Sequence, residues 1–171
     1  MKRRDIELKA TQILRDHNLL EIPVDPLKVA TALGIKVLNA VFSESDKSGV
    51  IVKRAGKLSI LLNTNESPAR KRFTIAHEIG HGLLHMAGDD NEFIDSNDNF
   101  RSIEPQEPES WGDIRVKEWE ANVFASALLM NEELLRKEFK ELSDPAILAW
   151  KFQVSQNAMI VRLSQLGLLT K

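Results

Sequence analysis

The first third of the chain changes from helical to strand-like hydrophobic periods. Apolar residues recur at helical spacing over residues 5–17, which predicts an amphipathic helix. Asp25 followed by Pro26 is typical of a helix start and Gly34 of a helix end, so a short second helix is expected between them. The pattern then turns to runs rich in Ile, Val and Leu, which predict three strands at residues 35–42, 49–53 and 58–63.

From Ser67 onward the hydrophobic periods are helical, with one interruption. A helix is expected from Ser67-Pro68 to about Met86, and it carries apolar residues on more than one side, as central buried helices do. Residues 88–114 show no such period and are rich in Asp, Asn, Glu, Pro and Ser, which predicts a long acidic surface loop. Helices are then expected at about 115–130, 131–141 and 145–168, the last one broken near Val154-Ser155.

This order of elements predicts an α+β fold with a small three-stranded sheet and helices segregated from it. We expect one domain over residues 1–171, made of N-terminal helices and sheet (1–64), a central part with the acidic loop (65–131) and C-terminal helices (132–171). The pattern around Val154 is similar to a helix-turn-helix. Few basic residues accompany it, so no direct binding of nucleic acid is expected.

Composition narrows the chemistry that the chain can carry. Of its 171 residues, 43% are hydrophobic and 28% charged, which is typical of a folded, soluble domain. The 23 basic and 25 acidic residues give a net charge of -2, which argues against a strongly basic surface. No apolar run approaches the ~20 residues of a membrane span, so a cytoplasmic protein without membrane contact is expected. Because cysteine is absent, a metal must be held by His, Asp or Glu.

One motif carries recognisable chemistry: His77-Glu78-Ile79-Gly80-His81, the HExxH pattern, inside the predicted central helix. Residues four apart differ by about 40° around a helix and about 6 Å along it, so His77 and His81 can bind one metal ion from the same face. Neutral imidazole suits zinc, and Glu78 is expected to take a proton from the zinc-bound water as general base. Two buried histidines with only local hydrogen bonds are the alternative. Gly80 fits either a tolerated glycine or a close backbone approach.

A catalytic zinc ion normally has three protein ligands, so a third one is needed. Glu118 and Asn122 stand at i and i+4 in the next long helix. We expect Glu118 as the ligand and Asn122 as a residue that hydrogen-bonds a ligating histidine. Glu120 is the rival ligand, although it points about 160° away from Asn122 around the helix. His85 follows His81 by one turn and is interpreted as structural or substrate-facing, because it lies too far along the axis to be a third ligand.

Two segments resemble the ImmA/IrrE-type metallopeptidases, namely Arg72-Phe73-Thr74-Ile75-Ala76-His77-Glu78-Ile79-Gly80-His81 with Leu83-Leu84-His85, and Glu118-x-Glu120-Ala121-Asn122 with Leu128-Leu129-Met130. The resemblance implies a zincin-like (gluzincin) fold in which His77, His81 and Glu118 bind zinc, or manganese, and Glu78 is the base. It also implies an endopeptidase whose substrate is a helix-turn-helix transcriptional repressor. The chain is expected to be the peptidase domain alone, with the substrate bound extended along the sheet edge.

The absence of tyrosine is a departure that bears on the mechanism. No phenol can polarise the scissile carbonyl, so Arg115, Arg101 and His85 are the candidates for stabilising the oxyanion. The alternative function is a non-catalytic, metal-stabilised partner or a DNA-binding module of a repressor or toxin–antitoxin-like system. Glu78 favours the enzyme, because a purely structural zinc needs no base and prefers four protein ligands.

Overall fold

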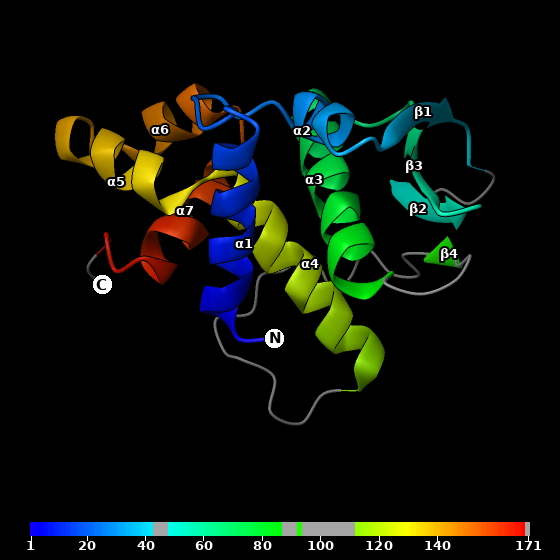
Figure 1. Ribbon diagram of the computed structural model, residues 1–171. Coiled ribbons are helices and arrows are strands. Elements are labelled where there is room, and N and C mark those ends of the chain that lie inside the picture. Colours follow the sequence, from blue (N-terminus) through cyan, green and yellow to red (C-terminus); the bar gives the residue numbers. More distant parts are fainter. Residues whose placement is uncertain (43–47, 87–91, 94–111, 170–171) are drawn as a thin grey trace.

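The described part of the chain, residues 1–42, 48–86, 92–93 and 112–169, forms helices around a small sheet in the computed structural model (Figure 1). The first half consists of α1 (Arg3–Asp16), α2 (Pro26–Ala32), β1 (Lys36–Ala40), β2 (Gly49–Arg54) and β3 (Lys57–Asn63). The second half consists of α3 (Pro68–His85), β4 (Glu92–Phe93), α4 (Asp113–Leu129), α5 (Glu132–Glu141), α6 (Pro145–Phe152) and α7 (Gln156–Gln165). The α+β class and the order of the predicted helices are confirmed.

The sheet is mixed, with the strand order β1-β3-β2-β4. β1 runs parallel to β3, whereas β2 pairs antiparallel with both β3 and β4. The three predicted strands are present as β1, β2 and β3, and a fourth strand, β4, lies inside the segment expected to be loop (88–114). A strand of two residues has no period to detect, and it forms because Ile51 and Val52 of β2 offer a backbone edge for pairing. Most of the remaining expected loop lies outside the described residues.

Side-chain caps explain where the helices nearest the site begin. The Ser67 side chain accepts a hydrogen bond from the backbone N–H of Arg70 at 3.4 Å, and a proline follows it, so α3 starts where the cap pattern predicts. The expected break in the C-terminal helix is also confirmed. Gln153 adopts a left-handed conformation (φ 54°) after α6, and Ser155 caps α7 by accepting from the N–H of Ala158 at 3.2 Å.

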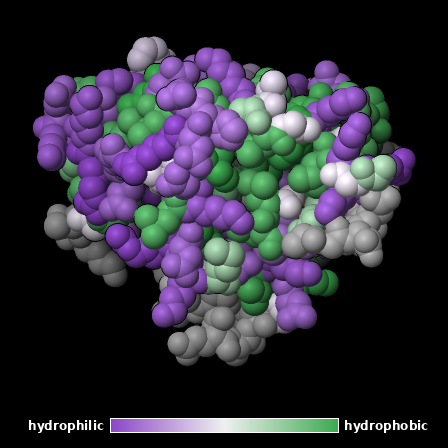
Figure 2. Space-filling model, viewed as in Figure 1, coloured by the Kyte–Doolittle hydropathy of each residue, from purple (hydrophilic) through white to green (hydrophobic). Residues whose placement is uncertain are grey.

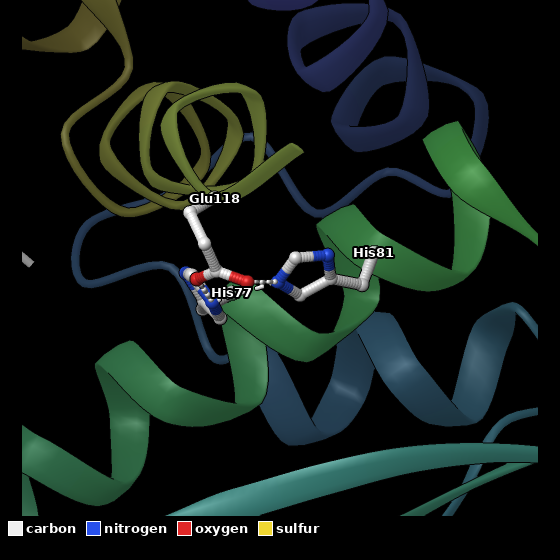
Figure 3. Close-up of side chains that lie close together, drawn as sticks. All are labelled: His77, His81 and Glu118. Carbon is white, nitrogen blue, oxygen red and sulfur yellow. Dashed lines mark hydrogen bonds and ion pairs between the residues drawn. The ribbon is translucent and has the colours of Figure 1, made fainter. Parts of the chain in front are cut away.

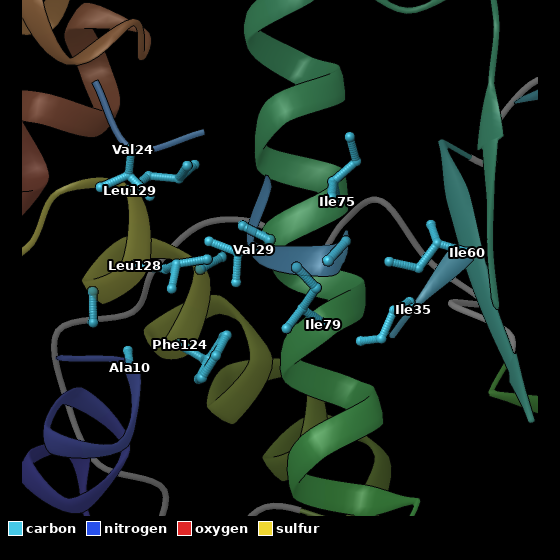
Figure 4. Close-up of a cluster of buried hydrophobic side chains, with 14 of the residues drawn as sticks. Ala10, Val24, Val29, Ile35, Ile60, Ile75, Ile79, Phe124, Leu128 and Leu129 are labelled. Carbon is cyan, nitrogen blue, oxygen red and sulfur yellow. The ribbon is translucent and has the colours of Figure 1, made fainter. Parts of the chain in front are cut away.

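Helix α3 runs through the middle of the molecule, with the sheet on one side and α4 on the other (Figure 1). Ile75 and Ile79 are 3% and 0% exposed and lie between Ile60 of the sheet and Phe124 of α4 (Figure 4). Full burial of such a side chain stabilises the fold by about 1.5–3 kcal/mol. The polar residues in the same stretch of α3 are therefore held in place by well-packed neighbours on both sides.

A second apolar cluster joins α5, α6 and α7 to the end of α4. Arg162 of α7 ties this cluster to the rest of the fold. Its Nε donates to the carbonyl of Met130 at 3.1 Å, and its Nη1 pairs with Glu7 of α1. Figure 2 shows hydrophilic residues over much of one face, with hydrophobic residues gathered near its centre. None of the helices in the described ranges has the length and apolar character to cross a membrane.

Candidate metal centre

Three side chains from two packed helices converge in the interior (Figure 3). His77 and His81 project from α3, and Glu118 projects from α4. The Nε2 atoms of the two histidines are 2.9 Å apart. The Glu118 carboxylate places Oε2 3.3 Å from Nε2 of His77 and Oε1 3.2 Å from Nε2 of His81. One donor atom from each residue lies within 4.8 Å of the others, so the three can bind a single ion together.

The protonation states of His81 and Glu118 are the ones that metal binding requires. Burial and the neighbouring His77 lower the pKa of His81 to about 3, against the opposing influence of Glu118. Burial alone would raise the pKa of Glu118, but its hydrogen bonds with His77 and His81 lower that pKa to about 2. At neutral pH the site therefore offers neutral imidazole and an ionised carboxylate. This set of donors fits a divalent ion such as zinc.

Glu78 directly follows His77 in α3 and is fully buried. Strand β2 begins directly against it, since a Cβ atom added to Gly49 would lie 3.6 Å from Cγ of Glu78 and 2.5 Å from Cγ2 of Thr74. A glycine at position 49 therefore makes room for Thr74, whereas the distance to Glu78 is an ordinary van der Waals contact. No sequence pattern singles out Gly49, because its role depends on how the strand packs on the helix. The assignment of Glu78 as general base stays a prediction.

Gly80, which precedes His81 in α3, lies where α3 packs closely against α4. A Cβ atom added there would lie 3.2 Å from Cα of Ala121 and 3.2 Å from Cβ of Phe124. Of the two interpretations of this glycine, the structure favours a close approach of the two helices. Ala121 stands three residues after Glu118, so the spacing at Gly80 also sets how near the Glu118 carboxylate comes to the histidines.

His85 and Glu120 are joined to the metal residues through His81. Nδ1 of His85 lies 3.2 Å from Nδ1 of His81, and Nε2 of His85 lies 2.7 Å from Oε2 of Glu120. The other carboxylate oxygen of Glu120 accepts from the amino group of Met1. Burial lowers the pKa of His85, against the opposing hydrogen bond with Glu120. Glu120, the rival ligand, thus pairs with a histidine outside the three-donor cluster.

Two further predicted residues, Arg115 and Asn122, lie on α4 before and after Glu118. Asn122 is buried one turn beyond Glu118 on α4, and its expected hydrogen bond to a ligating histidine stays a prediction. Arg115 lies in the first turns of the same helix, three residues before Glu118. Arg101, another oxyanion candidate, lies outside the described residues.

Comparison with known proteins gives one consistent family. A family model described as the IrrE N-terminal-like domain matches residues 30–164. The chain is 32% identical over 110 residues to the radiation response metalloprotease IrrE of Deinococcus radiodurans, an alignment that covers 62% of this chain and 30% of that protein. It is 41% identical over 76 residues to the protein of the same name from Deinococcus deserti, covering 44% of this chain and 24% of that protein. The chain thus spans less than a third of these relatives.

A solved structure of a Mycobacterium tuberculosis transcriptional regulator has a similar fold. Its TM-score with this chain is 0.67 at 17% sequence identity, and the match covers 94% of this chain and 46% of that one. At this level of identity the likeness concerns the fold alone. It extends over nearly all the elements that surround the candidate metal centre.

Proposed function

The chain belongs to the IrrE N-terminal-like domain family, and from this premise we propose that it is a zinc-dependent endopeptidase that hydrolyses a peptide bond in a protein substrate. The observation that carries the proposal is the convergence of His77, His81 and Glu118, with the buried Glu78 directly after His77 in α3. A purely structural zinc site would use four protein ligands and would need no such acid. Three ligands and an adjacent carboxylate are the arrangement of a hydrolytic site.

Each residue then has a defined role. His77, His81 and Glu118 would hold the metal. When bound, zinc lowers the pKa of a coordinated water to about 7 and polarises the scissile carbonyl. Glu78 would accept the proton of the attacking water and later deliver it to the leaving nitrogen, which general acid–base catalysis requires. Glu78 is fully buried, and the start of β2 packs against its Cγ.

The substrate would lie along the edge of the sheet and reach a neighbouring cavity. Among the described residues, β4 covers only Ile51 and Val52 of β2, so an extended segment could pair at Gly49, beside Glu78. A cavity of about 410 Å³ lies between the start of α3 and α7. Phe73 lines it, and the Phe73 ring lies 6.1 Å from the His77 ring. Ala158→Trp, which would fill this cavity, should lower cleavage and leave zinc affinity unchanged.

The finer part of the proposal is that the substrate is a helix-turn-helix transcriptional repressor. The resemblance to the ImmA/IrrE-type peptidases supports it. The strongly acidic composition of residues 88–114, next to α3 and α4 in the chain, is also suited to a basic DNA-binding protein. The alternative is a metal-stabilised partner that inactivates a repressor by binding alone. Zinc is preferred over manganese because two imidazoles and one carboxylate are typical zinc ligands.

Glu78→Gln separates the enzyme from the binding protein. We expect this variant to bind zinc as the wild type does, because Glu78 is not a ligand. Cells producing either protein would be compared by labelling newly formed protein N-termini. The wild type should create N-termini that the variant does not, and those N-termini should fall in helix-turn-helix proteins. Equal sets of N-termini would refute the peptidase. New N-termini only in other proteins would refute the repressor as substrate.

A further inference from the structure

A continuous row of polar side chains leads from the candidate metal centre toward the end of α3. It consists of His81, His85 and Glu120, joined by contacts of 3.2 Å between the two Nδ1 atoms and 2.7 Å between His85 Nε2 and Glu120 Oε2. The side chains of His81, His85 and Glu120 are only 0%, 5% and 8% exposed. Both contacts have the length of real hydrogen bonds, so each ring nitrogen needs a definite donor or acceptor role.

Metal binding by Nε2 of His81 determines which ring nitrogens of His81 and His85 carry protons. A neutral imidazole that offers Nε2 to a cation carries its proton on Nδ1. Nδ1 of His81 is therefore a donor, and Nδ1 of His85 has to accept from it. His85 then carries its own proton on Nε2, which donates to the carboxylate of Glu120. One arrangement of protons satisfies every contact in the row, with all donors pointing toward the carboxylate.

We propose that His85 and Glu120 are positioning residues that hold the His81 ring in the tautomer and orientation needed to bind the metal. This inference rests on the metal site of the proposed function and adds residues to which that site assigns no role. A hydrogen bond from the distal ring nitrogen to a partner fixes a ligating imidazole and raises its basicity. Here the partner is a second histidine, and the negative charge of Glu120 acts on His81 through it.

The proposal also explains why two residues resemble ligands without being part of the three-donor cluster. His85 stands four residues after His81 on α3, and Glu120 stands two residues after Glu118 on α4. The pair His81–His85 on one helix therefore meets the pair Glu118–Glu120 on the other. Each histidine contacts a different glutamate, at 3.2 Å for Glu118 and 2.7 Å for Glu120.

The first test needs no variant. The chain contains only four histidines, so nitrogen-15 spectra of histidine-labelled, zinc-loaded protein can be assigned ring by ring. We expect the proton of His81 on Nδ1 and the proton of His85 on Nε2. A proton on Nδ1 of His85 would overturn the proposal, because that nitrogen could then not accept from His81.

The second test measures zinc affinity by competition with a chromophoric chelator. His85→Leu removes both hydrogen bonds, and we expect the affinity to fall on the order of 10- to 100-fold, as for other residues that orient a ligand. His85→Gln keeps one acceptor and one donor and should restore most of the affinity. Leu84→Ala, in the same turn of α3, is the control for loss of packing. If His85→Leu binds zinc as tightly as Leu84→Ala does, the positioning role is refuted.

Coupling between the two residues provides the last check. If His85 and Glu120 act on His81 as one unit, His85→Leu combined with Glu120→Leu should weaken zinc binding no more than His85→Leu alone. Additive losses would show that the two residues act separately. Failure of the wild type to bind zinc would refute the proposed function itself. If the wild type binds zinc and every variant binds it with the same affinity, only the present inference is refuted.

Discussion

Replacing Gly80 with alanine tests whether the spacing of α3 and α4 sets the affinity of the metal site. Alanine is the better helix former by about 1 kcal/mol, which favours the variant. The added Cβ atom would lie 3.2 Å from both Cα of Ala121 and Cβ of Phe124, closer than ordinary van der Waals contact. Overpacking of this kind typically costs about 1–3 kcal/mol. We therefore expect the metal-free variant to be less stable by about 0–2 kcal/mol.

Zinc affinity should respond more strongly than stability does. Relief of the contact requires the helices to separate by a few tenths of an ångström. That shift carries Glu118 away from His77 and His81, because Ala121 lies one turn beyond Glu118 on α4. Metal–ligand distances tolerate only about 0.2 Å of deviation. We expect the dissociation constant for zinc to rise about tenfold, which corresponds to about 1.4 kcal/mol.

Gly82→Ala is the matched control, because Gly82 lies in the same helix but faces the sheet. Its added Cβ atom would meet the ends of flexible side chains, at 2.7 Å from Cδ1 of Ile51 and 3.2 Å from Cδ1 of Leu58. Those side chains can move without shifting α4. Chelator competition would give the zinc affinities, and urea denaturation in a chelator would give the stabilities. If Gly80→Ala binds zinc as tightly as the wild type and as Gly82→Ala, the helix spacing does not control the site.

Three further outcomes follow from the same contacts. Zinc at 100 times its dissociation constant should raise the free energy of unfolding by about 2.7 kcal/mol, measured by urea denaturation. The Glu118→Gln variant should lose most of this increase, and an increase equal to that of the wild type would contradict the role of Glu118 as a ligand. Metal-free protein should lose stability as the pH falls from 6.5 toward 3, because His81 binds a proton in the unfolded chain but not in the folded one. The loss due to His81 should be at most about 1.4 kcal/mol per pH unit, and a His81→Gln variant with the same pH profile would contradict this prediction. Glu7→Ala should cost about 3–5 kcal/mol in thermal or urea unfolding, because it leaves the buried Arg162 without its ion pair, and a loss below 1 kcal/mol would be typical only of an exposed pair.

Long elements with strong local signals could be predicted from the sequence. Ser67 and Pro68 mark the start of α3, and the apolar residues around the HExxH motif indicate a buried helix. Strand β4 could not be predicted, because two residues have no period and their pairing depends on β2. The same reason hides Gly49, which is required only because β2 packs closely against Thr74 of α3. Periodicity describes single elements, whereas these features arise where two elements meet.

The two glutamates of α4 illustrate how far side-chain chemistry can be inferred before the packing is known. Glu118 and Glu120 differ by about 200° around the helix, so they must face different neighbours. On a surface helix one of them would face solvent, and the choice of ligand would follow from amphipathicity. Helix α4 is instead buried from Glu118 onward on every side, so both carboxylates need partners inside the protein. Shared spacing with Asn122 favours Glu118 as the ligand. The partner of Glu120 depends on the packing of the end of α3, which brings His85 against it.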